Sequence, residues 1–383
     1  MQGCPDDPGG RRAKPGQRRR AVPATPARAV GAAAVPDASR GRRTGKRGGA
    51  RAAPERAGAV EYGPVTVGAP PVSTVTPAFR EVAAGLRFPE GPVAMPDGSV
   101  IVVEIARGTL SRVTPDGRVH VVAALGGGPN GAAVGPGGKI YVTNNGGFNW
   151  VERPGRLFPT TQPADYRGGS IQVVDPETGK FETLYEACDG RRLRGPNDLV
   201  FDRAGGFWFT DLGKTRERDQ DRGAVYYARA DGSMIREAIF PLERPNGIGL
   251  SPDERTLYVA ETPTARCWAF RLSAPGRIES AEGPYRGEKG TVLVGLGGYQ
   301  MFDSLAVDAE GHVAVATLVT GAVSDVWPDG SRVVQYRLPD MMVTNVCFGG
   351  PDLRTAYATL SMTGRLVAFP WPRPGLPLPY LHR

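Results

Sequence analysis

Six polar side chains stand at the same place in six similar segments of the sequence, and their types could bind a cation. They are Glu90, Asn130, Asn197, Asn246, Asp303 and Asn345. All six carry a carboxylate or carboxamide oxygen, and no Lys or Arg occupies this position. Two carboxylates brought together in a confined space repel each other unless they are protonated or neutralised. Because all the donors are oxygens, the set favours a hard divalent ion such as Ca²⁺.

The alternative for several of these residues is simple turn chemistry. Asn within Pro-Asn-Gly is common in turns and tolerates left-handed backbone conformations. Taken alone, Asn130, Asn246 or Asn345 is better explained as a turn residue. The shared register of all six weakens that explanation, and Glu90 is not a turn-forming residue.

The segments that carry these residues share one pattern of strands and turns. Seven residues after each polar residue stands a residue of a Gly- or Asp-containing turn: Asp97, Gly137, Ala204, Asp253, Glu310 and Asp352. Each turn is followed by a β-branched or aromatic run, such as residues 100–103 or 207–209, and most units continue with a third and a fourth strand. Six units of four strands, repeating every ~40–67 residues, predict an all-β fold, a six-bladed β-propeller with four-stranded blades. The innermost strand of each blade lines the axial channel, so the six polar residues should form a ring at one channel mouth.

The ends of the repeat indicate how the propeller closes. The last unit turns proline-rich after its third strand, and residues 79–84 can supply the missing fourth strand. This pairing would close the ring and remove exposed strand edges. We therefore expect a lead-in segment at residues 61–78, the propeller at residues 79–383, and residues 370–383 as an extended tail along its surface.

The charge of the chain is concentrated at its N-terminus. Residues 1–60 carry a net charge of +10 and the remainder −2, although the whole chain is at +8. This Arg/Pro/Ala/Gly-rich stretch lacks apolar periodicity, which predicts a disordered basic tail. The near-neutral body argues against nucleic-acid binding, and no apolar stretch is long enough to predict a membrane span. We expect a cytoplasmic protein, with export through a weak twin-arginine signal at Arg18, Arg19 and Arg20 as the alternative.

Other catalytic and structural motifs have little support. The only histidines are His120, His312 and His382, none placed as a catalytic base, which argues against Ser-His and Cys-His mechanisms. No glycine-rich phosphate loop is present. The four cysteines, Cys4, Cys188, Cys267 and Cys347, are far apart in sequence and are interpreted as small apolar residues.

Two insertions interrupt the repeat. Residues 146–168 hold Phe148, Trp150, Phe158 and Tyr166, and such a loop is either a lid over the pocket or a self-packed surface loop. Residues 214–222 are charged and are interpreted as a solvated loop.

Together these segments resemble the gluconolactonase/regucalcin (SMP-30) family of six-bladed propellers. The phrases that carry the resemblance are Phe88-Pro89-Glu90-Gly91-Pro92, Gly195-Pro196-Asn197-Asp198-Leu199, Arg244-Pro245-Asn246-Gly247-Ile248, Asp303-Ser304-Leu305-Ala306-Val307-Asp308 and Phe348-Gly349-Gly350-Pro351-Asp352-Leu353. The resemblance implies one divalent cation held by Glu90, Asn246 and Asp303, with Asn197 as a further ligand or a substrate contact. Ca²⁺ is favoured, and Zn²⁺, Mg²⁺ or Mn²⁺ are alternatives.

The chain departs from the family pattern at two places. Ser304 replaces the glycine that usually follows the aspartate. Gly195 stands where regucalcin-type members have an arginine two residues before the middle Asn, and Arg194 lies one residue further back. Asn130, Arg194 and Asn345 are interpreted as substrate contacts.

The sequence thus predicts a metal-dependent hydrolase that opens a small, sugar-type lactone, with Asp303 as the candidate general base. Two alternatives stay open: a metal-dependent phosphotriesterase or other ester hydrolase, and a non-catalytic propeller that binds a metal or ligand. Polar residues at the ends of second strands are further candidates for the pocket: Glu104, Asn144, Asn145, Asp211 and Glu261. The partner is a small-molecule lactone or ester, and the sequence does not indicate an oligomeric state.

Overall fold

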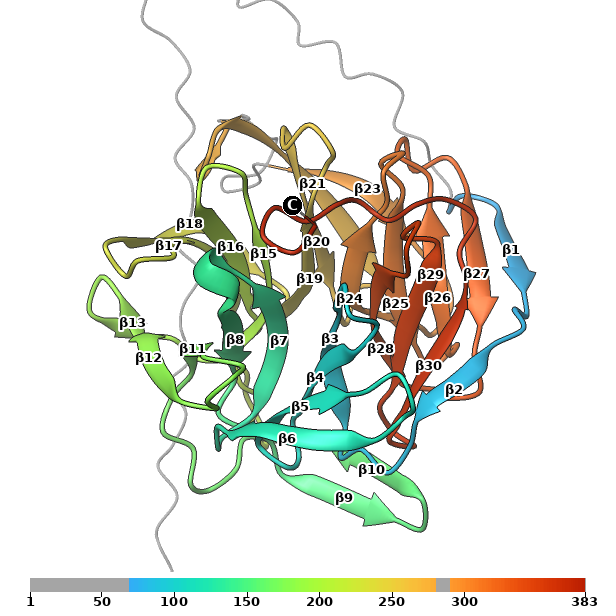
Figure 1. The fold of residues 1–383 in the computed structure, drawn as a ribbon. Helices are drawn as coiled ribbons and strands as arrows, with labels where there is room; N and C mark the ends of the chain where they lie inside the picture. The colour runs from blue at the N-terminus through green and yellow to red at the C-terminus, as the bar shows by residue number, and fades with distance from the viewer. Residues whose placement is uncertain (1–68, 280–289, 383) are drawn as a thin grey trace, which may run out of the picture. The chain divides into compact units, whose positions relative to one another are not determined.

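The fold is a six-bladed β-propeller, as the repeat predicts. The computed structural model describes residues 69–279 and 290–382. Six antiparallel sheets surround a central axis, with β3, β7, β15, β19, β24 and β28 innermost (Figure 1). The segment proposed as a disordered tail, residues 1–60, lies outside the described residues.

The first three blades follow one another along the chain. Blade 1 consists of β3 (Pro89–Ala94), β4 (Val100–Glu104), β5 (Thr109–Val113) and β6 (Val119–Ala124). Blade 2 consists of β7 (Pro129–Val134), β8 (Ile140–Asn144), β11 (Ser170–Val174) and β12 (Phe181–Tyr185), with a short 3₁₀ turn at Pro136–Gly138. Blade 3 consists of β15 (Pro196–Phe201), β16 (Gly206–Asp211), β17 (Gly223–Arg229) and β18 (Ile235–Leu242), preceded by the small hairpin β13 (Ala187–Cys188) and β14 (Arg191–Arg192).

The last three blades complete the circle. Blade 4 consists of β19 (Pro245–Leu250), β20 (Thr256–Glu261), β21 (Arg266–Ala274), β22 (Arg277–Ile278) and β23 (Thr291–Gly295). Blade 5 contains β24 (Met301–Val307), β25 (Val313–Leu318), β26 (Ala322–Val326) and β27 (Val333–Arg337). Blade 6 contains β28 (Val343–Gly349), β29 (Thr355–Leu360) and β30 (Arg365–Pro370).

Two strands from the N-terminal side complete the last two blades. The strand β2 (Arg80–Ala83) pairs antiparallel with β30, which confirms the predicted closure of the ring. The strand β1 (Val72–Val75), inside the predicted lead-in segment, pairs in parallel with β27 and gives blade 5 a fifth strand. The N-terminal side of the propeller therefore joins blades 5 and 6 through backbone hydrogen bonds.

The hydrophobic core lies between neighbouring blades. β-Branched and aromatic side chains of the second and third strands fill it, and Ile101, Phe207 and Trp208 are fully buried. Between blades 2 and 3, Tyr141 packs edge-on against Phe201 at 5.0 Å between ring centroids. Cys188 and Cys267 are buried free thiols, which agrees with their interpretation as small apolar residues.

We expect the C-terminal segment to run along the surface, but part of it lies inside the propeller. Residues 376–382 line one end of the channel and close a cavity of about 120 Å³ together with the inner strands. Leu381 is buried in the core cluster of blades 1 and 2. The prediction of a surface tail is wrong because alternating leucines and prolines can fill an apolar channel end.

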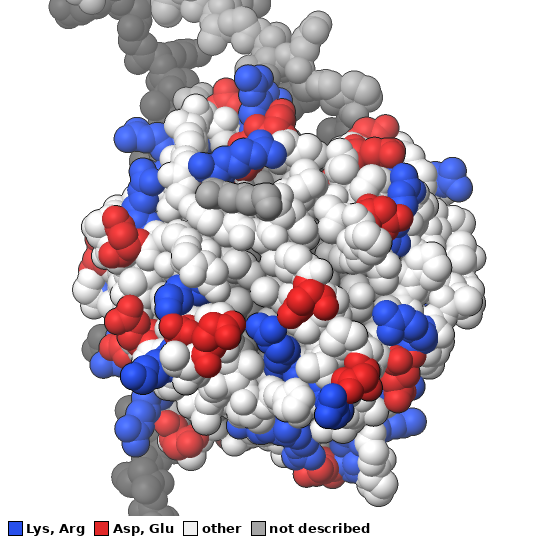
Figure 2. All heavy atoms as spheres, viewed as in Figure 1, with Lys and Arg blue, Asp and Glu red and all other residues white. Residues whose placement is uncertain are grey.

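None of the described residues forms a helix that is long and apolar enough to cross a membrane. On the face drawn in Figure 2, Lys and Arg side chains are interspersed with Asp and Glu side chains. This face offers no continuous basic surface to a polyanion.

We expect ring closure to be essential for folding. A variant that lacks residues 1–84 loses β2, leaves the edge of β30 unpaired and should be insoluble. A variant that lacks only residues 1–78 retains β2 and should fold, with a lower thermal midpoint from the loss of β1. Solubility and circular dichroism of the two variants check this prediction. A soluble, folded 1–84 deletion would contradict it.

Candidate functional site

The inner strands bring the six predicted residues to corresponding places around the channel. All six are at least nine-tenths buried: Glu90, Asn130, Asn197, Asn246, Asp303 and Asn345. The strand pairing shifts register beside each of them, between an inner strand and its neighbour. Such bulges re-aim side chains and are common next to active sites. The irregularity therefore allows a polar residue at the start of each inner strand to face the channel.

Close contacts between neighbouring inner strands explain why glycine follows Glu90 and Asn246. A side chain at Gly91 would lie 2.7 Å from the backbone nitrogen of Ala132, and one at Gly247 would lie 2.5 Å from that of Leu305. Gly91 also has a positive φ of 49°. Glycine is required where two backbones approach this closely.

Hydrogen bonds hold the ring residues in fixed orientations. Asn345 Nδ2 donates to Glu90 Oε2 at 2.7 Å, and the backbone N–H of Gly91 donates to the same oxygen at 2.9 Å. Asn246 donates to Asp303 and also, over 3.2 Å, to Thr262 Oγ1. Glu90 and Asp303, far apart in sequence, are therefore both oriented by a neighbouring carboxamide.

A third carboxylate, missed by the sequence analysis, joins these two. Asp198 follows Asn197 at the place that glycine occupies in blades 1, 2 and 4, and it is only 8% exposed. Burial, reinforced by the charge of Glu90, raises the pKa of Asp198 to about 8. Burial raises the pKa of Glu90 to about 7, and burial together with Glu90 raises the pKa of Asp303. Three carboxyl groups in one dry site thus oppose each other's ionisation.

The arrangement fits a divalent cation. Asn197 Oδ1 is buried and has no hydrogen-bond partner among the described residues. A buried, unpaired amide oxygen is costly unless a ligand satisfies it. A divalent cation beside Glu90 and Asp303 would bind this amide oxygen and would neutralise both carboxylates.

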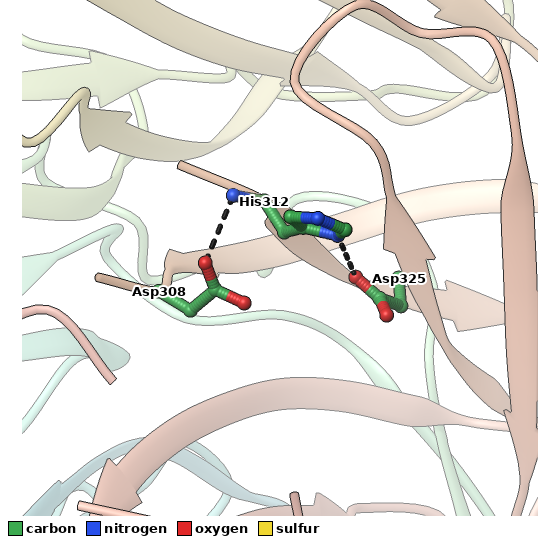
Figure 3. A group of neighbouring side chains, drawn as sticks. All are labelled: Asp308, His312 and Asp325. Atoms are coloured by element: carbon green, nitrogen blue, oxygen red, sulfur yellow. Dashed lines mark hydrogen bonds and ion pairs between the residues drawn. The ribbon is translucent and has the colours of Figure 1, made fainter. Parts of the chain in front are cut away.

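A second cluster, in blade 5, has metal-like residue types but a different role. Asp308, His312 and Asp325 lie close together and buried (Figure 3). His312 Nδ1 lies 2.9 Å from Asp325 Oδ1, and the backbone N–H of His312 donates to Asp308. The guanidinium of Arg373 pairs with Asp308 at 2.5 Å and with Asp325 at 2.6 Å. Because Arg373 already forms ion pairs with both carboxylates, we interpret this cluster as the anchor of the C-terminal segment.

The aromatic insertion packs at the end of the propeller where the inner strands begin. Its hairpin, β9 (Trp150–Arg153) and β10 (Arg156–Pro159), projects from the propeller at the end opposite the C-terminal segment (Figure 1). Leu157 is buried against Phe88 and Ile105 of blade 1, and its N–H donates to the carbonyl of Met362 in blade 6. The insertion therefore packs on blades 1 and 6 as well as on its own blade. We refer to residues 146–168 as the lid loop.

Residues 217–220 and Arg222 are exposed, as a solvated loop requires, but Lys214 at the start of this segment is not. Lys214 is only 2% exposed. Its Nζ donates to the carbonyl of Gly147 at 2.5 Å and to Asn145 Oδ1 at 3.3 Å, and it lies 4.3 Å from the centre of the Phe148 ring. Burial lowers its pKa to about 7. A lysine in a charged segment usually stays in water, so only the long-range contact with the aromatic loop reveals its role.

The remaining candidate residues lie at the rim of the channel, at the ring, or beneath the loops that precede the inner strands. Arg194 is exposed at the rim, where its carbonyl accepts a hydrogen bond from Tyr166 Oη at 2.6 Å. Asn145 reaches the ring, donating to Asn130 Oδ1 at 2.7 Å. The other strand-end residues accept hydrogen bonds from backbone N–H groups in the loops before the inner strands: Glu104, Asn144, Asp211 and Glu261. These four support the loops and do not contact the ring residues.

The raised carboxyl pKa values predict how the stability of the metal-free protein depends on pH. The folded state binds the protons of Glu90 and Asp198 more tightly than the unfolded chain does. The free energy of unfolding should therefore fall as pH rises from about 4 through about 8, by on the order of a few kcal/mol. Chemical unfolding of chelator-treated protein across this range measures the slope. The double variant Glu90→Gln/Asp198→Asn should flatten it, and an equal slope in both proteins would contradict the cause.

Comparison with known protein families identifies the fold family. A family model described as the SMP-30/gluconolactonase/LRE-like region matches residues 88–362. The chain belongs to this family. The match includes all six ring residues of this SMP-30/gluconolactonase/LRE-like protein.

Individual relatives of this family member include enzymes of two kinds. A gluconolactonase of Zymomonas mobilis is 27% identical over 300 residues, covering 72% of this chain and 77% of that protein. A diisopropyl-fluorophosphatase of Loligo vulgaris is 29% identical over 225 residues, covering 55% of this chain and 68% of that protein. Among solved structures, a calcium-binding regucalcin of Agrobacterium tumefaciens superimposes with a TM-score of 0.63 at 21% identity, covering 81% of this chain and 99% of that one.

Proposed function

We propose that this protein is a metal-dependent lactonase that opens a small, sugar-type lactone. The proposal is carried by the buried carboxyl groups of Glu90, Asp198 and Asp303, whose charges act on one another. The buried amide oxygen of Asn197, which has no hydrogen-bond partner among the described residues, adds to it. An enzyme that hydrolyses a carbonyl compound needs an electrophile to withdraw charge and a base to activate water. The likeness to the gluconolactonase of Zymomonas mobilis supports the choice of a lactone.

Each ring residue has a role in this proposal. Four ring residues would hold the cation: Glu90, Asn197, Asn246 and Asp303. Because all four supply oxygen atoms, Ca²⁺ is the favoured ion. Zn²⁺, Mg²⁺ and Mn²⁺ are the alternatives. When bound, a divalent cation supplies Lewis acidity that polarises a carbonyl oxygen.

The protein's own groups perform the proton transfer and the positioning. Asp303, oriented by Asn246, accepts a proton from the attacking water. Asn130, Asn345 and Arg194 contact the substrate, Arg194 from the rim. The aromatic loop over the mouth limits the entry of bulk water, which strengthens the electrostatic interactions within the site.

A phosphotriesterase activity is the second candidate. It is favoured by the likeness to the diisopropyl-fluorophosphatase of Loligo vulgaris. The same site could polarise a P=O bond in place of a C=O bond. A non-catalytic propeller that binds a metal or ligand is the third reading.

A substrate panel with and without metal tests the three candidates. Hydrolysis of sugar lactones, a simple aliphatic lactone and a fluorophosphate ester is followed by acid release at constant pH. We expect turnover of one or more lactones, its loss after chelation and its recovery with Ca²⁺. Turnover of the ester alone would favour the second candidate. Metal binding without turnover of any compound would favour the third candidate, a non-catalytic binding protein.

A further inference from the structure

Arg244 is a partly buried arginine next to the ring whose backbone is held in an unusual conformation. It precedes Pro245 at the start of β19 and has a φ of 51°, in the left-handed region. A residue other than glycine rarely adopts this region, and the residue before a proline normally prefers extended backbone. Phe88 has a φ of 58° at the same place in blade 1, and its ring packs 5.1 Å from that of Trp150 under the lid. In both blades the left-handed residue stands directly before the proline that starts the inner strand.

One edge of the Arg244 guanidinium has no hydrogen-bond partner among the residues that the structure describes. Nη1 donates to Thr215 Oγ1 at 2.9 Å. Nε is buried without a hydrogen-bond partner, and none of the described residues accepts a hydrogen bond from Nη2. The edge formed by Nε and Nη2 presents two parallel N–H groups, the geometry that binds a carboxylate or phosphate through two oxygens.

The charges around Arg244 also favour an anionic ligand. Burial and the nearby charge of Arg244 lower the pKa of Lys214, and Asp211 and Asp221 oppose this effect, so Lys214 is a second basic group beside Arg244. The carboxylate that attracts Arg244 is Asp303, a residue assigned above to the cation. If Glu90 and Asp303 neutralise a dication, Arg244 keeps an unbalanced positive charge in a dry place. A substrate anion would balance it.

The position of this edge suits a substituent of the substrate. Thr215, the partner of Arg244, accepts a hydrogen bond at its carbonyl from the N–H of Gln162 in the lid loop, at 2.8 Å. Arg244 therefore lies between the ring residue Asp303 and the lid. A group bound to it would belong to a molecule whose other end reaches the ring.

We propose that Arg244 binds a carboxylate or phosphate group carried by the lactone, so that the preferred substrates are acidic sugar lactones. This proposal rests on the proposed lactonase function. It assigns Arg244 as the residue that determines specificity, and it leaves proton transfer to Asp303.

Matched lactones test the proposal. Glucono-1,4-lactone and glucaro-1,4-lactone have the same ring and differ by one carboxylate, so this pair tests recognition of a carboxylate. The pair of glucono-1,5-lactone and 6-phosphoglucono-1,5-lactone tests recognition of a phosphate. Wild type should prefer one acidic lactone over its neutral counterpart. Arg244→Gln should lower kcat/KM for that acidic lactone by about 10- to 100-fold, chiefly through KM, and change the neutral one less than about 3-fold.

Two further variants serve as controls. Arg244→Lys keeps the charge but loses the two-pronged edge, and it should recover only part of the preference. Arg271→Gln removes an exposed arginine of the same blade and should behave as wild type. An equal loss by Arg244→Gln on neutral and acidic lactones would overturn the proposal, as would a wild type without any preference for acidic lactones.

Binding of inert sugars separates this proposal from the lactonase activity. Glucuronate and glucose 6-phosphate carry the two anions, glucose carries neither, and none of the three is a lactone. Calorimetry should show wild type binding one of the anionic sugars at least about 10-fold more tightly than glucose, and Arg244→Gln losing that difference. If this holds while no lactone is hydrolysed, the lactonase function fails and the anion site stands. If the two proteins bind the anionic sugars equally, the anion site fails even where lactones are hydrolysed.

Discussion

Replacing Asp303 with Asn should lower kcat for lactone hydrolysis by about 100- to 10,000-fold, the range for loss of a general base. The side chain keeps its shape, so the fold should be retained, and its hydrogen bond with Asn246 can be replaced by an amide pair. One negative charge disappears from the ring, so metal binding should also weaken. Steady-state kinetics and circular dichroism measure both consequences.

The control for Asp303→Asn is Asp329→Asn in the same blade. Asp329 lies in an exposed turn, where it accepts a hydrogen bond from Ser331 Oγ at 2.6 Å. The control should retain the activity of wild type. If Asp303→Asn retained full activity and full metal affinity, the assignment of the site would be wrong.

Replacing Glu90 with Gln should weaken the affinity for the divalent cation by about 100-fold, because the charge of the ligand set controls affinity. The hydrogen bonds from Asn345 and Gly91 require an acceptor, and the Gln carbonyl can supply one. Saturating metal should restore most of the activity of Glu90→Gln, since the base at Asp303 is intact.

The same excess of metal should not rescue Asp303→Asn. This contrast separates a residue that only binds the ion from one that also moves a proton. Kinetics at increasing Ca²⁺ concentrations measure it. Identical rescue of both variants would show that Asp303 is a ligand and not the base.

The sequence was sufficient for the blades, because a turn seven residues after each ring position fixes the register of every inner hairpin. It also predicted that residues 79–84 close the ring, since the last unit lacks its outer strand. The pairing of β1 with β27 could not be predicted in this way. A four-residue exposed strand carries no alternating apolar pattern that would identify its partner.

The site was predicted in outline and missed in three residues. Asp198 was missed because the bulge that turns it into the channel depends on how β15 pairs with β16. Lys214 reads as one charge among several in a charged insertion, and only its contact with the loop after Asn145 buries it. Arg244 belongs to the motif in which Asn246 was predicted as a metal ligand, and the arginine itself was not considered. The positive φ of Arg244 cannot be predicted from the residue types.

Calorimetric titration of Ca²⁺ into chelator-treated protein tests the central claim most directly. The account predicts one site per chain in the wild type and no measurable binding in the double variant Glu90→Gln/Asp303→Asn, although this variant folds. The matched double variant Asp308→Asn/Asp325→Asn should still bind one ion, because Arg373 already pairs with both of these carboxylates in the wild type. A wild type that binds no divalent ion, or a ring variant that binds it as tightly as the wild type, would contradict the account.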